Sequence, residues 1–174
     1  MLRLGVISDT HGFYREEIDD LFANCDHIFH TGDIGSPAII ERLQQIAPTT
    51  WVKGNCDFNS MLPPNTESEQ NIALGNFRIY LTHQPEHVDR FLFQLEQEDR
   101  QGELPYICLH GHTHIGRIDT GNDAYPAKLI FNPSSASRPR AFRADPSVGI
   151  IEIDGPAIKS AKLLNMEGVC LEQM

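Results

Sequence analysis

Five short segments of this sequence place Asp, Asn or His directly after a short apolar run, in most cases beside a glycine. In chain order they are Ser8-Asp9-Thr10-His11-Gly12, Thr31-Gly32-Asp33, Gly54-Asn55-Cys56-Asp57, His83 and His110-Gly111-His112-Thr113-His114. Carboxylate, amide and imidazole groups suit Mn, Fe, Zn, Co or Ni ions, whereas a thiolate-rich set would indicate a structural zinc site. Each segment alone is also typical of a surface loop or a turn. Their joint occurrence after apolar runs favours a metal site.

The number of donors favours two ions over one. The two Asp, one Asn and four His side chains are too many for a single ion that keeps open positions for a substrate. Two ions about 3.5–4 Å apart that share a bridging carboxylate hold a phosphoryl group and lower the pKa of a bound water. The resulting hydroxide is available at neutral pH, which predicts hydrolysis of a phosphate ester.

The segments between these motifs predict the elements that position them. Short apolar runs predict strands at residues 4–8, 27–30 and 49–53, and apolar side chains at helical spacing predict a helix at residues 15–24. A second helix is expected to begin at Pro37, after Ser36 as its N-cap, with an apolar face made of Ile39, Ile40, Leu43 and Ile46. Further along, the pattern predicts a hairpin with strands near 69–73 and 77–82, a helix around 86–100, and strands at 106–109, 115–120, 128–131, 147–153 and 157–164. Ligands bind beyond the carboxyl ends of parallel strands in α/β sheets, so the motifs are expected to converge there.

The strand count favours an α/β fold with two packed sheets flanked by helices over one large open sheet. A chain of 174 residues with 40% hydrophobic composition is long enough to bury its own core. No internal repeat or long linker divides the sequence, so residues 1–174 are expected to form a single domain.

The charge balance bears on the partners. The chain has 24 Asp and Glu against 14 Lys and Arg, a net charge of −10 with its eight histidines neutral. Proteins that bind nucleic acid or anionic membranes carry basic surfaces, so neither partner is expected. The four cysteines are far apart in sequence, and no apolar stretch approaches the roughly 18 residues of a membrane-spanning helix. A cytoplasmic location is therefore expected.

The chain resembles the calcineurin-like metallophosphoesterases. The resemblance rests on the ordered series Asp9-x-His11, Gly32-Asp33, Gly54-Asn55-x-Asp57, His83 and Gly111-His112-x-His114, and it extends to Asn132-Pro133-Ser134-Ser135. The small size and the Gly-Asn-Cys-Asp block are similar to the short bacterial and archaeal phosphodiesterase (YfcE-like) branch. The resemblance implies a four-layer αββα sandwich of two mixed sheets, with a dinuclear site at the carboxyl ends of the strands.

The resemblance also implies a set of site residues. One ion would be held by Asp9, His11, Asp33 and His114, and the other by Asp33, Asn55, His83 and His112, with Asp33 as the bridge. Catalytic roles are expected for Asn55, Asp57 and His83, and substrate contacts for Asn55, Cys56, Phe58 and Arg138. The two divalent ions are expected to be Mn, with Fe, Zn, Co or Ni as alternatives.

These residues predict a hydrolase that cleaves a small or nucleotide-like phosphodiester, or a phosphomonoester, by a metal-bridging hydroxide. A homodimer or homotetramer is expected. The alternative is a non-catalytic scaffold, because the retromer scaffold subunit resembles the same small fold; the complete donor set favours the enzyme. The leaving-group acid stays open, because many relatives carry His at the position of Cys56 and continue with Gly-His where this chain has Gln84-Pro85.

Three residues beside the motifs have two interpretations each. Phe13 and Phe58 follow two ligand segments and are expected to pack in the core, with a place in a substrate pocket, as its floor or stacked on a base, as the alternative. Asp57 is expected either to orient a ligand through a hydrogen bond or to cap a turn.

Overall fold

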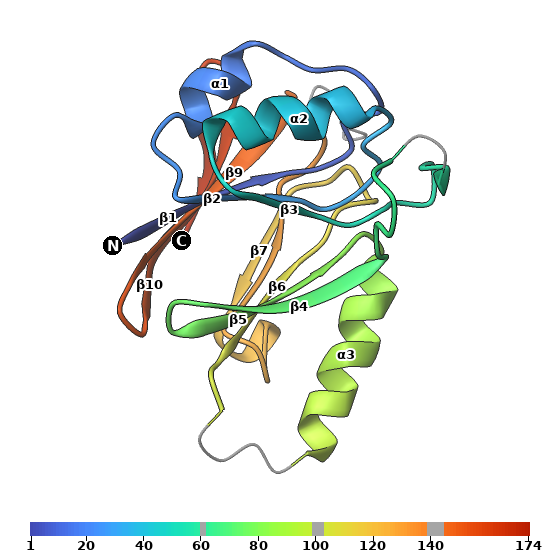
Figure 1. Cartoon of the computed structure of the whole chain (residues 1–174). Helices are drawn as coiled ribbons and strands as arrows, with labels where there is room; N and C mark the ends of the chain where they lie inside the picture. Colours follow the sequence, from blue (N-terminus) through green and yellow to red (C-terminus); the bar gives the residue numbers. More distant parts are fainter. Residues whose placement is uncertain (60–61, 99–102, 139–144) are drawn as a thin grey trace.

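The computed structural model describes residues 1–59, 62–98, 103–138 and 145–174. Two β-sheets pack face to face, with helices on their outer surfaces (Figure 1). From one edge to the other, the six-stranded sheet contains β11 (Cys170–Gln173), β10 (Ala157–Asn165), β9 (Ser147–Asp154), β1 (Leu2–Ile7), β2 (His27–His30) and β3 (Thr49–Trp51). The five-stranded sheet contains β4 (Glu69–Leu74), β5 (Phe77–Thr82), β6 (Tyr106–Leu109), β8 (Leu129–Asn132) and β7 (Arg117–Thr120).

Both sheets are mixed. In the first, β1, β2 and β3 run parallel, with Leu4 opposite His27 and His30 opposite Trp51, while β9 is antiparallel to β1. In the second, β5, β6 and β8 run parallel, and β4 and β7 add antiparallel edges. Each sheet therefore has three parallel strands whose carboxyl ends lie on the same side.

Helices α1 (Glu17–Phe22) and α2 (Pro37–Ile46) cover the six-stranded sheet, and α3 (Pro85–Gln97) covers the five-stranded one (Figure 1). A 3-10 turn, η2, spans Gly121–Asp123. Both α2 and α3 begin with proline, whose missing N–H has no partner to lose in the first helical turn. None of the described helices combines the length and apolarity needed to cross a membrane. The predicted four-layer αββα sandwich is confirmed.

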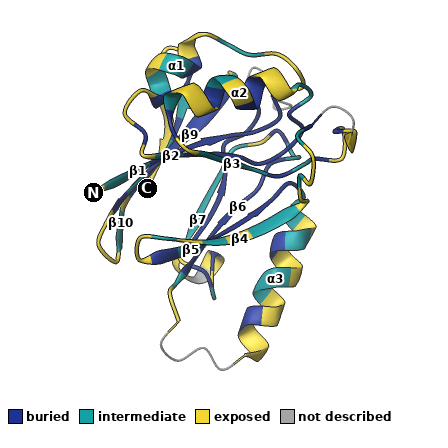
Figure 2. Cartoon of the chain, viewed as in Figure 1, coloured by how far each residue is buried: buried dark blue, intermediate teal, exposed yellow. Residues whose placement is uncertain are grey.

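Period-two alternation along the strands fills three separate cores. On β1, Leu4 and Val6 enter the core between the sheets, whereas Ile7 faces the helices and packs in the core that includes Phe22 of α1. A third core lies between α3 and the second sheet and includes Val88. Figure 2 shows the sheet interior as the most buried part of the molecule. The sheets are thus fixed on both faces, which makes their strand ends a rigid support.

Several predicted boundaries differ from the observed ones by a few residues. The helices expected at 15–24 and 86–100 are shorter, and residues 99–100 lie outside the described chain. The strand expected at 115–120 begins at Arg117. Strand β11 was not predicted. Its side chains are all exposed, so the sequence shows no alternation between buried and exposed positions.

Candidate metal centre

The predicted ligand residues come together where the parallel strands of both sheets end. Asp9 follows β1 and His114 follows β6, yet Asp9 Oδ1 and His114 Nε2 lie 2.9 Å apart. Asp33 follows the end of β2, and its Oδ2 lies 3.4 Å from Nε2 of His83, which follows β5. Side chains from two sheets therefore share one centre.

The first cluster consists of Asp9, His11, Asp33 and His114. His11 Nε2 lies 3.3 Å from His114 Nε2 and 3.8 Å from both Asp9 Oδ1 and Asp33 Oδ2. Asp9, His11 and His114 each offer one ligand atom, and these atoms lie within 4.8 Å of one another. This spacing is compact enough for the side chains to share one cation.

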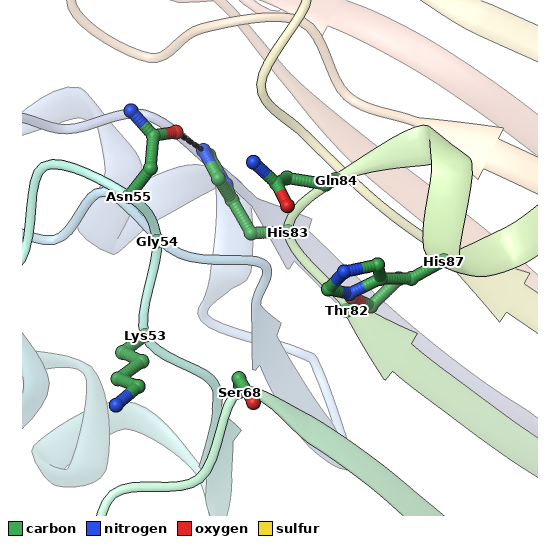
Figure 3. Close-up of a pocket in the computed structure, with 8 residues that line it drawn as sticks. All are labelled: Lys53, Gly54, Asn55, Ser68, Thr82, His83, Gln84 and His87. Carbon is green, nitrogen blue, oxygen red and sulfur yellow. Dashed lines mark hydrogen bonds between the residues drawn. The ribbon is translucent and has the colours of Figure 1, made fainter.

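The second cluster consists of Asp33, Asn55, His83 and His112. Asn55 Oδ1 lies 3.1 Å from His83 Nε2 (Figure 3) and 2.9 Å from His112 Nδ1. The carboxyl oxygen of Asp33 completes the group beside His83. The cluster therefore gathers one carboxylate, one amide oxygen and two imidazole nitrogens.

Asp33 lies between the two clusters. Its Oδ1 accepts the backbone N–H of Cys56 at 2.8 Å, which leaves Oδ2 facing both His11 and His83. Burial by itself raises the pKa of this carboxyl, but the hydrogen bond and charge of His83 outweigh burial and hold the pKa below its usual range. An ionised carboxylate at this position can serve both clusters at once.

Hydrogen bonds to backbone carbonyls orient the rings of two candidate ligands, His83 and His114. His83 Nδ1–H donates to Thr31 O at 2.8 Å, and His114 Nδ1–H donates to Arg138 O at 2.6 Å. A carbonyl oxygen can only accept, so in the neutral rings Nε2 is unprotonated and directs its lone pair into the centre. Metal-ligating histidines are typically oriented by this kind of bond.

The Nε2 atoms of both rings face carboxylate or amide oxygens. His114 Nε2 faces Asp9 Oδ1, a fully buried oxygen that has no hydrogen-bond donor among the described residues. His83 Nε2 likewise faces the oxygens of Asn55 and Asp33. Burial lowers the pKa of His83, but the hydrogen bond to Asp33 and the nearby carboxylates outweigh burial and raise it, so a proton on Nε2 holds this pair together in the metal-free protein and a metal ion can take its place. The donor set thus fits a bound divalent ion of the type that accepts nitrogen and oxygen ligands.

Backbone strain is concentrated at the same positions. Non-glycine residues seldom adopt positive φ, and each such residue costs of order 1–3 kcal/mol at most sites. Five of the seven predicted ligands do so, at φ values between 48° and 69°: Asp9, His11, Asp33, His112 and His114. Strain of this kind persists where the surrounding structure enforces it, and it points to a functional arrangement of these loops.

Asp57 ties two ligand loops together. Its Oδ1 accepts the N–H of Gly35 at 2.8 Å, and its Oδ2 accepts the N–H groups of Ile34 and Gly54 at 3.1 and 2.8 Å. These bonds join the loop that carries Asp33 to the loop that begins at Gly54. The sequence predicted that Asp57 either orients a ligand or caps a turn. In the structure its carboxylate accepts only backbone N–H groups among the described residues, as a capping carboxylate does, and it also joins the two loops.

Several serines that hold the Asp9 loop were not identified from the sequence. Ser8 Oγ–H donates to Asp9 Oδ2, and the hydroxyls of Ser135 and Ser137 donate to Asp9 O at 2.9 and 2.7 Å. Ser134 Oγ–H donates to His114 O at 3.0 Å. The Asn-Pro-Ser-Ser block was the only signal in the sequence. The carbonyls that its hydroxyls contact are set by the packing of the loop after β8 against the loop after β1, which the sequence does not show.

The predicted substrate contacts Cys56 and Arg138 both border the centre. Cys56 is exposed, and its Sγ lies with ligand atoms of His11 and Asp33 within 4.8 Å. Partial burial and the adjacent Asp33 carboxylate raise the pKa of its thiol, so the group is neutral at pH 7. Arg138 is exposed, and its own carbonyl anchors His114. The guanidinium is therefore free to extend beside the first cluster.

The expectation that Phe13 and Phe58 pack in the core is wrong. Phe13 is 54% exposed and Phe58 is 68% exposed. Each phenylalanine lies in a loop that also carries candidate ligand residues facing the centre. Its own ring therefore does not pack against a sheet. Their exposure leaves the alternative interpretation, contact with a substrate, consistent with the structure.

Two hollows border the centre, one beside each cluster. The hollow beside the second cluster is bordered by Asn55 and His83 (Figure 3) and continues to Lys53, Ser68 and His87. The hollow beside the first cluster is lined by His11 and by five further residues: Thr10, Phe13, Arg15, Ser137 and Arg138. A bound phosphate group at the centre would thus have room for a substituent on each side.

Two buried histidines support the ligand loops. His30 Nδ1 accepts the N–H of Gly32 at 3.2 Å, and its Nε2–H donates to Thr10 Oγ1 at 2.9 Å, since the Thr10 hydroxyl donates to Ile34 O. This network holds a neutral ring. Burial, the largest cause, lowers the pKa of His30 to about 3 and that of His110 to about 4.

These two histidines predict a loss of stability in mild acid. Between pH 6.5 and about 4 the unfolded chain binds protons on both rings that the folded chain does not bind, so the free energy of unfolding falls as pH falls. The expected loss by pH 5 is roughly 2 kcal/mol per ring. Urea unfolding of the metal-free protein between pH 7.5 and 4.5 measures it. A His30→Gln variant should show a slope smaller by about one proton, and an equal slope would contradict the assignment to His30.

Comparison with known proteins is consistent with this geometry. Residues 2–155 match the model of the calcineurin-like phosphoesterase superfamily domain. The chain belongs to the calcineurin-like phosphoesterase superfamily. A member named probable metallophosphoesterase, from Methanothermobacter thermautotrophicus, is 30% identical over 172 residues, which cover 96% of this chain and 95% of that protein.

Solved structures share the calcineurin-like phosphoesterase fold. Yfce, described as a phosphoesterase from E. coli, matches with a TM-score of 0.70 and 23% identity, over 99% of this chain and 98% of that chain. Vps29 from Entamoeba histolytica, described as complexed with Zn²⁺, matches with a TM-score of 0.74 and 22% identity, over 99% and 98% of the two chains. These structures confirm the fold, and the match of residues 2–155 and the 30% identical relative confirm the predicted family.

Proposed function

We propose that this chain is a metal-dependent phosphoesterase that binds two divalent ions and hydrolyses a small phosphodiester. The first cluster would hold one ion and the second cluster the other, with Asp33 as the shared ligand. The observation that carries the proposal is the convergence of ring nitrogens on carboxylate and amide oxygens, above all His114 Nε2 on the buried Asp9 Oδ1. Family membership supports it.

The residues around the two clusters would have different roles toward a bound phosphate. Two bound ions supply Lewis acidity and lower the pKa of water, which provides the nucleophile at neutral pH. Asn55 directs its Oδ1 to His83 and His112. One N–H of its Nδ2 donates to Cys56 Sγ at 3.4 Å, which leaves the other N–H to contact a phosphoryl oxygen. His83 is held at Thr31 O, and Asp57 holds the loop on which Asn55 lies.

The two hollows favour a diester over a monoester. A phosphodiester carries two ester groups on its phosphorus, and one hollow borders each of the two clusters. A monoester would occupy only one of them. Cys56, Phe58 and Arg138 remain the predicted substrate contacts; all three are exposed next to the ligand loops. The neutral Cys56 thiol is a poor stabiliser of negative charge, so we assign charge stabilisation to the ions and Asn55.

Hydrolysis of p-nitrophenyl esters tests the proposal. The protein is stripped of metal with a chelator and reloaded with Mn²⁺, and it is then expected to bind two equivalents of metal. Its kcat/KM for bis-p-nitrophenyl phosphate should exceed that for p-nitrophenyl phosphate by about tenfold or more, an estimate for one added binding group. The stripped protein should be inactive.

The non-catalytic alternative makes the opposite prediction. A metal-bound Vps29 shares this fold, so metal content alone does not separate a scaffold from an enzyme. Two bound equivalents of metal with neither ester cleaved would favour the scaffold and overturn the enzyme. Faster cleavage of the monoester would retain the enzyme and reject the diester preference.

A further inference from the structure

Large apolar side chains are exposed around the metal centre. Phe13 comes two residues after His11, and Ile115 comes directly after His114; both are 54% exposed. Phe58, at 68%, follows the loop that contains Asn55. Scattered exposed apolar residues are common on protein surfaces, but here each one lies within three residues of a candidate ligand in sequence, which points to a binding surface.

Phe13 differs from the other two because it is built into a hollow. It lines the space beside the first cluster together with His11 and Arg138. The guanidinium of Arg15 lies over the Phe13 ring, 5.1 Å from its centroid. Arg15 Nε–H in turn donates to Ala136 O at 3.1 Å, which fixes the guanidinium behind the ring. Phe13 is thus supported on one face while half of its surface stays open.

The substrate class follows from this arrangement. We infer that Phe13 stacks on the nucleobase of a nucleoside phosphate ester whose phosphate lies at the metal centre, an inference that rests on the proposed function. A flat aromatic ring backed by a guanidinium binds another flat ring, and every nucleobase presents such a face. Arg138, on the same hollow, would lie near the sugar-phosphate portion as a cation in an otherwise acidic protein.

The stack explains how an acidic protein could select a nucleotide without a basic surface. Stacking does not depend on charge and is tolerant of base identity. We therefore expect discrimination between substrates with and without a base, and little discrimination among the four bases.

Two ligands that differ only in the base test the inference. Calorimetric titration of the Mn²⁺-loaded protein with AMP and with ribose 5-phosphate should show about tenfold tighter binding of AMP, the size expected for one base–aromatic stack. Phe13→Ala should reduce this ratio to near one, whereas Phe13→Trp should retain it. Phe93→Ala is the matched control, because Phe93 is 64% exposed on α3 and lines neither hollow.

The outcomes separate this inference from the proposed function. Equal binding of AMP and ribose 5-phosphate by the unaltered protein, or a ratio that Phe13→Ala leaves unchanged, overturns the stacking role even if bis-p-nitrophenyl phosphate is cleaved. A ratio that falls with Phe13→Ala supports it, and because binding is the readout, that result does not depend on turnover. A melting temperature unchanged from the unaltered protein establishes that each variant is folded.

Discussion

Replacing Asp33 by Asn is expected to lower the kcat of bis-p-nitrophenyl phosphate hydrolysis by about a thousandfold or more, because the Lewis acidity of bound ions supplies several kcal/mol and about 4 kcal/mol corresponds to that factor. The side-chain oxygen would keep the bond to Cys56 N–H. The new NH₂ group would then point at the ring nitrogens of His11 and His83 in place of a charged oxygen. Both clusters lose their shared carboxylate at once.

Metal analysis and the rate are measured together for this variant. The bound metal should fall from two equivalents to one or none, while the variant stays folded, because the amide oxygen keeps the bond to Cys56 N–H. Asp145→Asn removes the same charge at an exposed position before β9 and should change neither property. Full activity of Asp33→Asn would contradict its place as the shared ligand.

Replacing Gly54 by Ala is expected to disrupt the centre by steric conflict. A Cβ atom at this position would lie 2.0 Å from Asp33 Oδ1 and 2.3 Å from Asp33 N, much closer than atoms can approach. The backbone of one loop must move, and overpacking of this kind costs about 3 kcal/mol at the upper end of its usual range. In a chain of this length that loss lowers the melting temperature by roughly 6–12 °C.

The same displacement should reduce activity at least a hundredfold, since an error of about 1 Å in a catalytic group has an effect of that size. Thermal unfolding and hydrolysis of bis-p-nitrophenyl phosphate measure the two effects. Gly121→Ala is the control: its Cβ would meet no atom within 4 Å, so only its positive φ of 62° costs free energy, about 1–2 kcal/mol. If Gly54→Ala retained full activity, close approach of the two loops would not be required.

The order of the elements could be predicted because local patterns carry it. The strands at 27–30 and 106–109 were predicted to the residue, and the helix beginning at Pro37 was recognised from its proline and apolar spacing. β11 could not be predicted because it is stabilised by pairing with β10 and has no buried face. The environment of Phe13 and Phe58 was predicted wrongly because residue type alone does not reveal which way a constrained loop turns.

The sequence by itself determined the types of the candidate ligands, their position after strands and the family, since these are properties of short motifs. The tertiary structure decided which atoms meet. Asp9 and His114 are more than a hundred residues apart and belong to different sheets, so only the packing of those sheets places Oδ1 beside Nε2. It also decided the orientation of the rings, because the carbonyls of Thr31 and Arg138 that receive the ring N–H groups come from distant loops. Hydrogen-bond direction and exposure depend on neighbours in space, and neighbours in space are set by the fold.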